Sequence, residues 1–309
     1  TVSEVDKLSG PILGRPKSAT FRTCDVVGLD TLVHVANGLK QNCPNDEEKE
    51  LFELPDYIAK MVDNNWLGSK SGQGFYKKEK DENGKRKILA LNLETLEYEV
   101  APKVKFPTLD MAKPIEDLRQ RTKMLVMGMD KAGEFYRKIF GGLLAYVSNR
   151  IPEISEEYYK IDDALKAGFG WELGPFESWD LFGYDQGLKF INDANKKMGA
   201  SIETMRFNGM TSFYKTENGK RMYFDTASNS YKVIPGTEDL VDLDSLRDEN
   251  KVWGNSDCTL VHVGDGILNL EFHTKMNTIG GGVLQGINKA LDIAENDYQG
   301  LVISNTGQN

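Results

Sequence analysis

The sequence predicts a mainly α-helical protein, with two tandem helical domains that each end in a β-hairpin, followed by the start of a ββαβ unit. Three observations lead to this prediction. A set of short sequence elements occurs twice, apolar residues recur at helical spacing in both copies, and the pattern changes after Trp253. A chain of 309 residues is long enough to form more than one hydrophobic core.

Four elements recur in the same order, and a duplicated domain explains this better than chance. Residues 25–30 (DVVGLD) are similar to residues 180–185 (DLFGYD), and a phenylalanine precedes each at the same offset. An apolar residue followed by aspartate lies further upstream in both copies, and an aromatic pair followed by an Asn-Gly segment lies downstream. The matching positions are Val5-Asp6 and Ile161-Asp162, Phe21 and Phe176, Phe75-Tyr76-Lys77 and Phe213-Tyr214-Lys215, and residues 82–86 and 217–221.

The helices are predicted from the spacing of apolar residues. Between Leu118 and Ile151 these residues recur at steps of three and four, which predicts one long helix or two helices end to end. The DVVGLD-type element precedes such a run in each copy, so we expect it to open a helix. Asp30 and Asp185 stand just before these runs, where a carboxylate can cap free helical N–H groups.

The predicted domain organisation has four parts. The first copy covers residues 1–105 and the second covers residues 106–236. Each copy closes with an Asn-Gly hairpin turn, at Asn83-Gly84 and at Asn218-Gly219. An acidic linker is expected at residues 237–252. Residues 253–309 are expected to form a hairpin, a helix over residues 280–295 and a short strand, which is an incomplete third domain.

Composition excludes several classes of protein. Hydrophobic residues make up 39% of the chain and charged residues 28%, which is typical of soluble globular proteins. The net charge of −9 gives no support to nucleic-acid binding, and no stretch is apolar enough to span a membrane. The three cysteines are scattered and the three histidines lack ligand spacing, so we expect reduced thiols, no metal site and a cytoplasmic location.

The two ends of the chain are expected to be cuts through a larger protein. The first residues include no initiator Met and no signal-peptide pattern, and the last residues form a strand-like run that stops shortly after Ser304. Residues that a site needs would then lie outside this sequence.

Several motifs resemble a known family. Residues 170–180 (GWELGPFESWD) resemble the Gly-x-Pro-Met-Gly-Pro-Phe-Glu-x-x-Asp element of the C-terminal domain of L-3-hydroxyacyl-CoA dehydrogenases, and residues 14–31 resemble the same element. Residues 65–76 resemble the Leu-Gly-x-Lys-x-Gly-x-Gly-Phe-Tyr segment that closes that domain. The likeness covers about residues 1–235. Residues 272–277 and 300–304 resemble, over a shorter match, the opening of an enoyl-CoA hydratase (crotonase) domain.

This order of domains resembles that of multifunctional β-oxidation proteins. The resemblance implies a parent enzyme that oxidises 3-hydroxyacyl-CoA to 3-oxoacyl-CoA with NAD and that also carries an enoyl-CoA hydratase. In that family the NAD site and a catalytic His–Glu pair lie in an N-terminal Rossmann domain, and no Gly-x-Gly-x-x-Gly follows a strand here. We therefore expect this chain alone to be inactive. The implied partners are an acyl-CoA substrate, the Rossmann domain of the same parent and a thiolase subunit.

The resemblance also points to candidate site residues, although no catalytic residue and no metal ligand is expected here. A substrate-binding role is implied for Pro16, Lys17 and Phe21, with a helix-packing corner as the alternative. A CoA-binding role is implied for Lys275, Met276 and Asn277, with an ordinary polar loop as the alternative. The matching aromatic residues of the second copy are expected to pack between domains, and these are Trp171, Phe176 and Trp179.

Two residue patterns resemble functional motifs but are not expected to form a catalytic or a dinucleotide-binding site. Asn149 and Arg150 form the family's Asn-Arg element in the second copy, but the first copy faces the nicotinamide domain in that family, so Asn149 is not assigned a catalytic role. The glycine-rich residues 280–286 lack the spacing of a dinucleotide loop and are expected to begin a helix.

The duplication has a consequence for assembly. In single-copy relatives this domain forms a homodimer contact, whereas two linked copies can satisfy the same surface within one chain. We therefore expect the elements around Phe21 and Phe176 to pack copy against copy and the chain to be monomeric. The rival hypothesis is a non-catalytic helical docking module for other β-oxidation proteins. An exposed apolar patch would favour that rival, and a cleft at residues 16–21 would favour the dehydrogenase.

Overall fold

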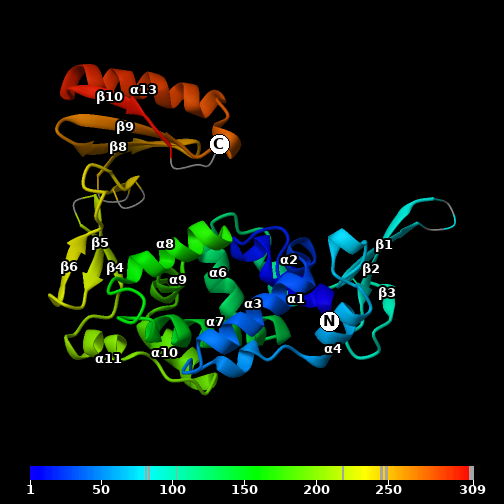
Figure 1. Cartoon of the computed structure of the whole chain (residues 1–309). Coiled ribbons are helices and arrows are strands. Elements are labelled where there is room, and N and C mark those ends of the chain that lie inside the picture. Colours follow the sequence, from blue (N-terminus) through cyan, green and yellow to red (C-terminus); the bar gives the residue numbers. More distant parts are fainter. Residues whose placement is uncertain are drawn as a thin grey trace. The chain divides into compact units, whose positions relative to one another are not determined.

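The computed structural model describes residues 1–305 apart from Asp81, Asn83, Pro102, Asn218, Asp244, Ser245, Asp248 and Glu249. The predicted turns at Asn83 and Asn218, and part of the predicted acidic linker, therefore lie outside the described residues. About half of the described chain is helical. The chain divides into two compact units, Thr1–Thr211 and Ser212–Asn309 (Figure 1).

The first part of the first unit combines helices with a small antiparallel sheet. Its helices are α1 (Val2–Ser9), α2 (Phe21–Val27), α3 (Leu29–Asn42) and α4 (Asp56–Asp63), with short 3-10 turns at η1 (Pro11–Leu13), η2 (Lys49–Phe52) and η3 (Ser69–Ser71). The sheet has the order β1-β2-β3, from strands β1 (Tyr76–Lys80), β2 (Arg86–Leu91) and β3 (Tyr98–Val100).

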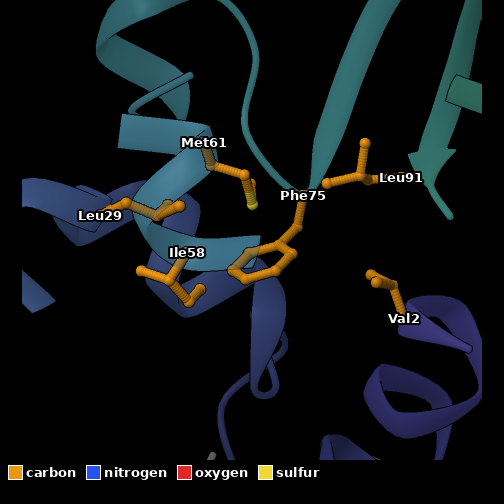
Figure 2. Close-up of a cluster of buried hydrophobic side chains, with 6 residues drawn as sticks. All are labelled: Val2, Leu29, Ile58, Met61, Phe75 and Leu91. Carbon is orange, nitrogen blue, oxygen red and sulfur yellow. The ribbon is translucent and has the colours of Figure 1, made fainter. Parts of the chain in front are cut away.

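Phe75 lies at the centre of the hydrophobic core of this part. Its ring stands among side chains from the helices and from the sheet, and it is 1% exposed. Figure 2 shows this cluster, which consists of Val2, Leu29, Ile58, Met61, Phe75 and Leu91. Because Phe75 directly precedes β1, the core fixes where the sheet leaves the helices.

The second part of the first unit is all helical. It contains α5 (Pro107–Ala112), α6 (Leu118–Met127), α7 (Lys131–Asn149), α8 (Tyr158–Phe169), α9 (Pro175–Phe182), α10 (Tyr184–Asp193) and α11 (Ala200–Phe207). Of the two alternatives for the Leu118–Ile151 pattern, the structure has two helices. The break lies at residues 128–130, where Asp130 caps α7 by accepting hydrogen bonds from the N–H groups of Ala132 and Gly133, each 3.1 Å away.

Asp30 does not occupy the cap position expected for it. The N-cap of α3 is Gly28, and Asp30 lies in the first turn of the helix. Its carboxylate pairs with Lys70 Nζ at 2.5 Å. Gly28 has a φ of 104°, a backbone conformation that a non-glycine residue at this position would adopt only with strain. This turn therefore requires glycine at position 28. Asp30 supports the helix from within its first turn.

The second unit contains two small sheets and one long helix. The first sheet has the order β4-β5-β6, from β4 (Tyr214–Glu217), β5 (Lys220–Asp225) and β6 (Ser230–Val233), all antiparallel. The second has the order β10-β9-β8-β7, from β7 (Lys251–Gly254), β8 (Cys258–Gly264), β9 (Ile267–Phe272) and β10 (Gly300–Ile303). The helix α13 (Gly281–Asp297) connects β9 to β10, which run parallel.

The ββαβ order expected after Trp253 is present, and one strand precedes it. That strand, β7, begins at Lys251, inside the stretch expected to be linker. Pairing with β8 places these residues in the sheet, and the acidic residues just upstream obscure that signal in the sequence. The core between α13 and the sheet consists of Cys258, Leu260, Leu268, Leu270 and Ala290.

In the described part of the chain, none of the helices is long and apolar enough to cross a membrane. No group of three or more His, Cys, Asp or Glu side chains in that part of the chain could hold a metal ion.

Candidate functional site

A pocket of about 580 Å³ opens within the first compact unit, where α1, η1 and the start of β1 meet α5. Its wall combines apolar side chains with lysines and two aspartates. The lining residues are Ser3, Asp6, Lys7, Pro11, Ile12, Lys17, Tyr76, Val104, Phe106, Leu109, Asp110 and Lys113. We call it the lysine pocket.

Asp6 organises one side of the lysine pocket. Its carboxylate accepts hydrogen bonds from the N–H groups of Thr20, Phe21 and Arg22 at 3.1, 2.6 and 3.0 Å. These N–H groups belong to the start of α2, where a helix leaves its first donors without partners. The fourth donor is the Tyr76 hydroxyl, 2.8 Å away. Asp6 therefore connects α1, α2 and β1 through one carboxylate.

Tyr76 remains a hydrogen-bond donor at neutral pH. Burial raises the pKa of its hydroxyl above the usual value, and the hydrogen bond to Asp6 raises it further. Both effects disfavour the phenolate. The hydroxyl can therefore hold the Asp6 carboxylate across the physiological pH range.

Asp25 fixes the position of Tyr76 from the other side. It is 2% exposed and accepts hydrogen bonds from the N–H groups of Phe75 and Tyr76 at 2.7 and 2.9 Å. Burial raises the pKa of this carboxyl, and the two hydrogen bonds act against that rise. A methyl group at Gly74 would collide with the Asp25 carboxylate, and one at Gly68 would collide with the Asp25 backbone, so the two glycines leave the space that Asp25 occupies. The Gly-x-Gly-Phe-Tyr segment thus has a structural role.

The same kind of contact occurs among the helices α5–α11, the second helical set of the first unit. Asp162, which matches Asp6 in the repeat, accepts hydrogen bonds from the N–H groups of Phe176 and Glu177, both at 2.9 Å. These groups begin α9, as Phe21 begins α2. Asp162 is 1% exposed. The repeated apolar-Asp pair therefore caps a neighbouring helix in both places.

The three substrate-binding candidates, Pro16, Lys17 and Phe21, lie in different parts of the first unit. Lys17 lines the lysine pocket. Phe21 packs in the core, with its ring centroid 4.5 Å from that of Phe75. Pro16 lies near Gly170, where a methyl group would be 3.4 Å from Pro16 Cγ. Of the three, Lys17 alone lines the pocket, while Pro16 and Phe21 pack against other parts of the protein.

The aromatic candidates of the second copy also separate into two groups. The Arg15 guanidinium lies 3.8 Å from the centroid of the Trp171 ring, and the N–H of Glu172 donates to the Gly14 carbonyl at 2.9 Å. Trp171 thus contacts the residues that follow η1. Phe176 and Trp179 are fully buried among the helices of the second set, with ring centroids 6.5 Å apart.

Lys275, Met276 and Asn277 form a short 3-10 turn, η4, in the second compact unit. Met276 is 71% exposed, and both Met276 and Asn277 have positive φ angles. These three residues belong to the second compact unit, whereas the lysine pocket belongs to the first.

The sequence did not single out several residues of the lysine pocket. Asp6 and Tyr76 carry a signal, because both belong to repeated elements. Lys7 and Lys113 carry none, since they lie far apart in the sequence and only the tertiary structure brings them to one pocket.

The glycine-rich start of α13 does not fit a dinucleotide. It lies in the connection between the parallel strands β9 and β10, a place where a helix start can hold a dinucleotide. A methyl group at Gly282 would overlap the Asp257 carboxylate, so a negative side chain already lies against the helix start. A pyrophosphate needs close approach to free N–H groups there and would be repelled by that charge.

Comparison with known proteins supports the first resemblance. Residues 1–78 match the family described as the C-terminal domain of 3-hydroxyacyl-CoA dehydrogenase. The whole chain is 41% identical to a probable 3-hydroxyacyl-CoA dehydrogenase of Bacillus subtilis, of which it covers 38%. A protein of Deinococcus radiodurans with the same description is 52% identical over 82 residues, 26% of this chain and 23% of that protein.

A more distant relative has a broader description. A putative fatty acid oxidation complex trifunctional enzyme of Rickettsia felis is 24% identical over 308 residues, 99% of this chain and 38% of that protein. The chain therefore spans 38% of the length of these two relatives that it matches from end to end. It is homologous to 3-hydroxyacyl-CoA dehydrogenases, and its first 78 residues match their C-terminal domain.

Proposed function

We propose that this chain is the substrate-side and structural portion of an NAD-dependent L-3-hydroxyacyl-CoA dehydrogenase of fatty-acid β-oxidation. The whole enzyme would oxidise 3-hydroxyacyl-CoA to 3-oxoacyl-CoA. NAD and the catalytic His–Glu pair are assigned to a domain outside these 309 residues. The observation that carries the proposal is the 41% identity to a probable 3-hydroxyacyl-CoA dehydrogenase along the entire chain.

The proposal includes a duplicated C-terminal domain in which the second copy is structural. The matching contacts of Asp6 with α2 and of Asp162 with α9 support the duplication. Asn149 of the second copy donates hydrogen bonds to the carbonyls of Ala145 and Lys197, at 3.1 and 3.0 Å. Its amide is thus engaged by the backbone, which supports leaving it out of catalysis.

The proposal assigns residues 253–309 to the start of an enoyl-CoA hydratase domain. The order of β8, β9, α13 and β10, with β10 parallel to β9, supports this assignment. A thiolase subunit remains a predicted partner. The prediction is consistent with the relative described as a trifunctional enzyme of a fatty acid oxidation complex.

The test is oxidation of 3-hydroxybutyryl-CoA, followed as NADH formation. The 309-residue chain, a separately expressed NAD-binding domain and their mixture are compared, and association of the two pieces is measured by sedimentation. We expect activity only in the mixture, because hydride transfer needs both the cofactor site and the substrate side. Two pieces that associate and stay inactive at every substrate concentration would refute the proposal.

A further inference from the structure

An apolar face of α2 and α3 is open to solvent. Val27 at the end of α2 is 53% exposed, and Val35 and Leu39 on α3 are 50% and 40% exposed. Val35 and Leu39 are four residues apart, so both lie on one side of their helix. We call these three side chains the α2–α3 face. A helix of a globular protein usually turns such an apolar side toward the core, so the face indicates that another element covers it.

The internal repeat contains a second version of this face. The helices α9 and α10 match α2 and α3, and the glycine that joins the two helices has a positive φ in both places, 104° between α2 and α3 and 86° between α9 and α10. In this match Phe182 occupies the position of Val27, and Phe190 occupies that of Val35. These two phenylalanines are 9% and 1% exposed. The same face is therefore open in one place and covered in the other.

The helix α7 covers the second version of the face. The Phe140 ring of α7 meets the Phe182 ring edge-on, with the ring centroids 4.8 Å apart. A methyl group at Gly141 of α7 would overlap the carbonyl oxygen of Phe190, so the backbones of α7 and α10 are in close contact there. This helix therefore keeps water away from both phenylalanines.

The order of elements shows where the matching cover for the α2–α3 face lies in the chain. In the second helical set, α7 comes directly before α8, and α8 carries Asp162. The match of Asp162 is Asp6, which lies on α1, and α1 begins at Val2. The position that corresponds to α7 therefore falls before Thr1. The two relatives that match this chain from end to end are longer than it, since the chain covers 38% of each.

We propose that the segment of the whole enzyme directly before Thr1 forms an amphipathic helix that packs on the α2–α3 face, as α7 packs on α9 and α10. The occupant of the face is then a part of the same polypeptide. Val27 and Val35 are smaller than the phenylalanines at the matching positions, so this helix has room for a side chain larger than Gly141 at the closest contact. The inference rests on the duplication within the proposed function, and it concerns how the first copy is completed rather than the reaction.

The first test measures whether the whole enzyme covers the face. Val35→Cys is made in the 309-residue chain and in the whole enzyme, and the rate of its reaction with a maleimide is compared, with the unsubstituted proteins as background. In the 309-residue chain the new thiol should react about as fast as that of the control Phe207→Cys, because Phe207 is 91% exposed. In the whole enzyme it should react at least about tenfold more slowly, since a buried thiol reacts only when the structure opens. Equal rates of Val35→Cys in the two proteins would overturn the proposal.

The second test identifies the occupant. The photoreactive residue benzoylphenylalanine replaces Leu39 in the whole enzyme, and the cross-linked peptides are identified by mass spectrometry. We expect a cross-link to the segment directly before Thr1, and the same replacement at Phe207, the control, should not give that cross-link. Absence of this cross-link from Leu39 would overturn the proposal. So would cross-links that instead join Leu39 to the NAD-binding domain, to a second copy of the chain or to another protein, the last of which is the result that the docking-module hypothesis predicts.

Failure of the helix and failure of the proposed function are separable, because neither test measures oxidation. Oxidation of 3-hydroxybutyryl-CoA by the whole enzyme, together with fast labelling of Val35→Cys in it, would keep the function and reject the helix. Slow labelling and the expected cross-link, without oxidation of that substrate, would keep the helix and reject the function.

Discussion

The residues that matter most in the first unit are acids whose oxygens bind the backbone. Asp6 and Asp25 together hold six hydrogen-bond donors, from the start of α2, from the Phe75 and Tyr76 N–H groups and from the Tyr76 hydroxyl. A buried donor that loses its acceptor costs more than the hydrogen bond contributes when it is formed. These two acids therefore specify how the helices meet the sheet, and they position one wall of the lysine pocket.

Tyr76→Phe tests the link between Asp6 and the sheet. The substitution removes one donor from Asp6 and leaves three, so the fold should survive with a free energy of unfolding lower by about 1 kcal/mol. The measurement is urea denaturation followed by circular dichroism. Tyr57→Phe is the matched control, because Tyr57 packs on the same core and its hydroxyl makes no hydrogen bond within the described residues. Equal stability of the two variants would contradict the role given to the Tyr76 hydroxyl.

Sequence alone could identify the residues that repeat, and it could not identify those that meet only in space. Asp6 and Asp162 stand out because they occupy matching positions of a repeated sequence element. In the structure, each carboxylate binds N–H groups at the start of a neighbouring helix. The resemblance implies a substrate-binding role for Phe21, with a helix-packing corner as the alternative, and its ring packs against Phe75. An apolar side chain in a motif fits a core and a cleft equally well, so composition could not decide between them.

At the scale of elements, the break between α6 and α7 is fixed by Asp130. Its carboxylate caps α7 and also accepts hydrogen bonds from the N–H and hydroxyl of Thr108, at 3.0 and 2.6 Å. Burial raises the pKa of this carboxyl, but the hydrogen bonds outweigh burial and hold the pKa below its usual value of 3.8. One acid thus joins α5 to α7.

Asp130→Ala should lower the free energy of unfolding by about 1 kcal/mol at neutral pH. The folded pKa lies below the unfolded value, so this contribution is present above the unfolded pKa and is lost as pH falls through the folded pKa. The stability difference between wild type and variant should therefore shrink below about pH 4. Denaturation from pH 7 to pH 3 measures it.

The control for this series is Asp63→Ala. Asp63 is an exposed acid at the C-terminal end of α4, where the helix dipole disfavours a negative charge. Its removal should cause no loss of stability at any pH in the series. A difference between wild type and Asp130→Ala that stays constant down to pH 3 would contradict the assignment of the pKa.

The helices and strands themselves were largely predictable. The 3.6-residue period gave the region of α6 and α7, and the change of pattern after Trp253 gave β8, β9, α13 and β10. The strand β7 was missed because the run of acidic residues upstream favoured a solvated linker. Strand pairing with β8 is a tertiary effect that local composition does not report.

At the scale of the whole first unit, charged side chains join the segment after α3 to the end of α7. Arg150 Nη2 lies 2.8 and 2.6 Å from the two oxygens of Glu47. Tyr146 donates a hydrogen bond to Asp46 at 2.8 Å, and Lys196 pairs with Glu48 at 2.6 Å. Three consecutive acids after α3 thus meet one helix, α7, through Tyr146 and its C-cap Arg150, and a second cation, Lys196, after α10.

Arg150→Met should break this connection. The Arg150 side chain is 15% exposed, so its removal leaves Glu47 without its cation and should lower the free energy of unfolding by about 1–3 kcal/mol. The segment 43–53 should also be cleaved faster in limited proteolysis. Arg119→Met is the control, since Arg119 is exposed and makes no ion pair among the described residues. Identical proteolysis of the two variants would contradict the account.

Contacts of α1 and η1 with α6 and α7 also predict the state of assembly. Arg121 Nε donates to the Ile12 carbonyl and the Tyr136 hydroxyl donates to the Leu8 carbonyl, both at 3.0 Å. If the chain holds two copies of one domain, as proposed, these contacts and the Arg15–Trp171 contact take the place of a contact with a second chain. Sedimentation velocity should therefore show a monomer over a wide range of concentration. A stable dimer that Arg15→Ala dissociates would show that this face is shared between chains.

The central claim is that these 309 residues supply the substrate side of a 3-hydroxyacyl-CoA dehydrogenase. The most direct test is to replace the aligned segment of the Bacillus subtilis relative, 38% of that protein's length, with these 309 residues. Oxidation of 3-hydroxybutyryl-CoA is then measured under the same conditions for the unmodified relative, called the parent here, and for the folded chimera. The account predicts that the chimera oxidises the substrate at a rate comparable to the parent. A chimera that is folded and inactive beside an active parent would contradict it.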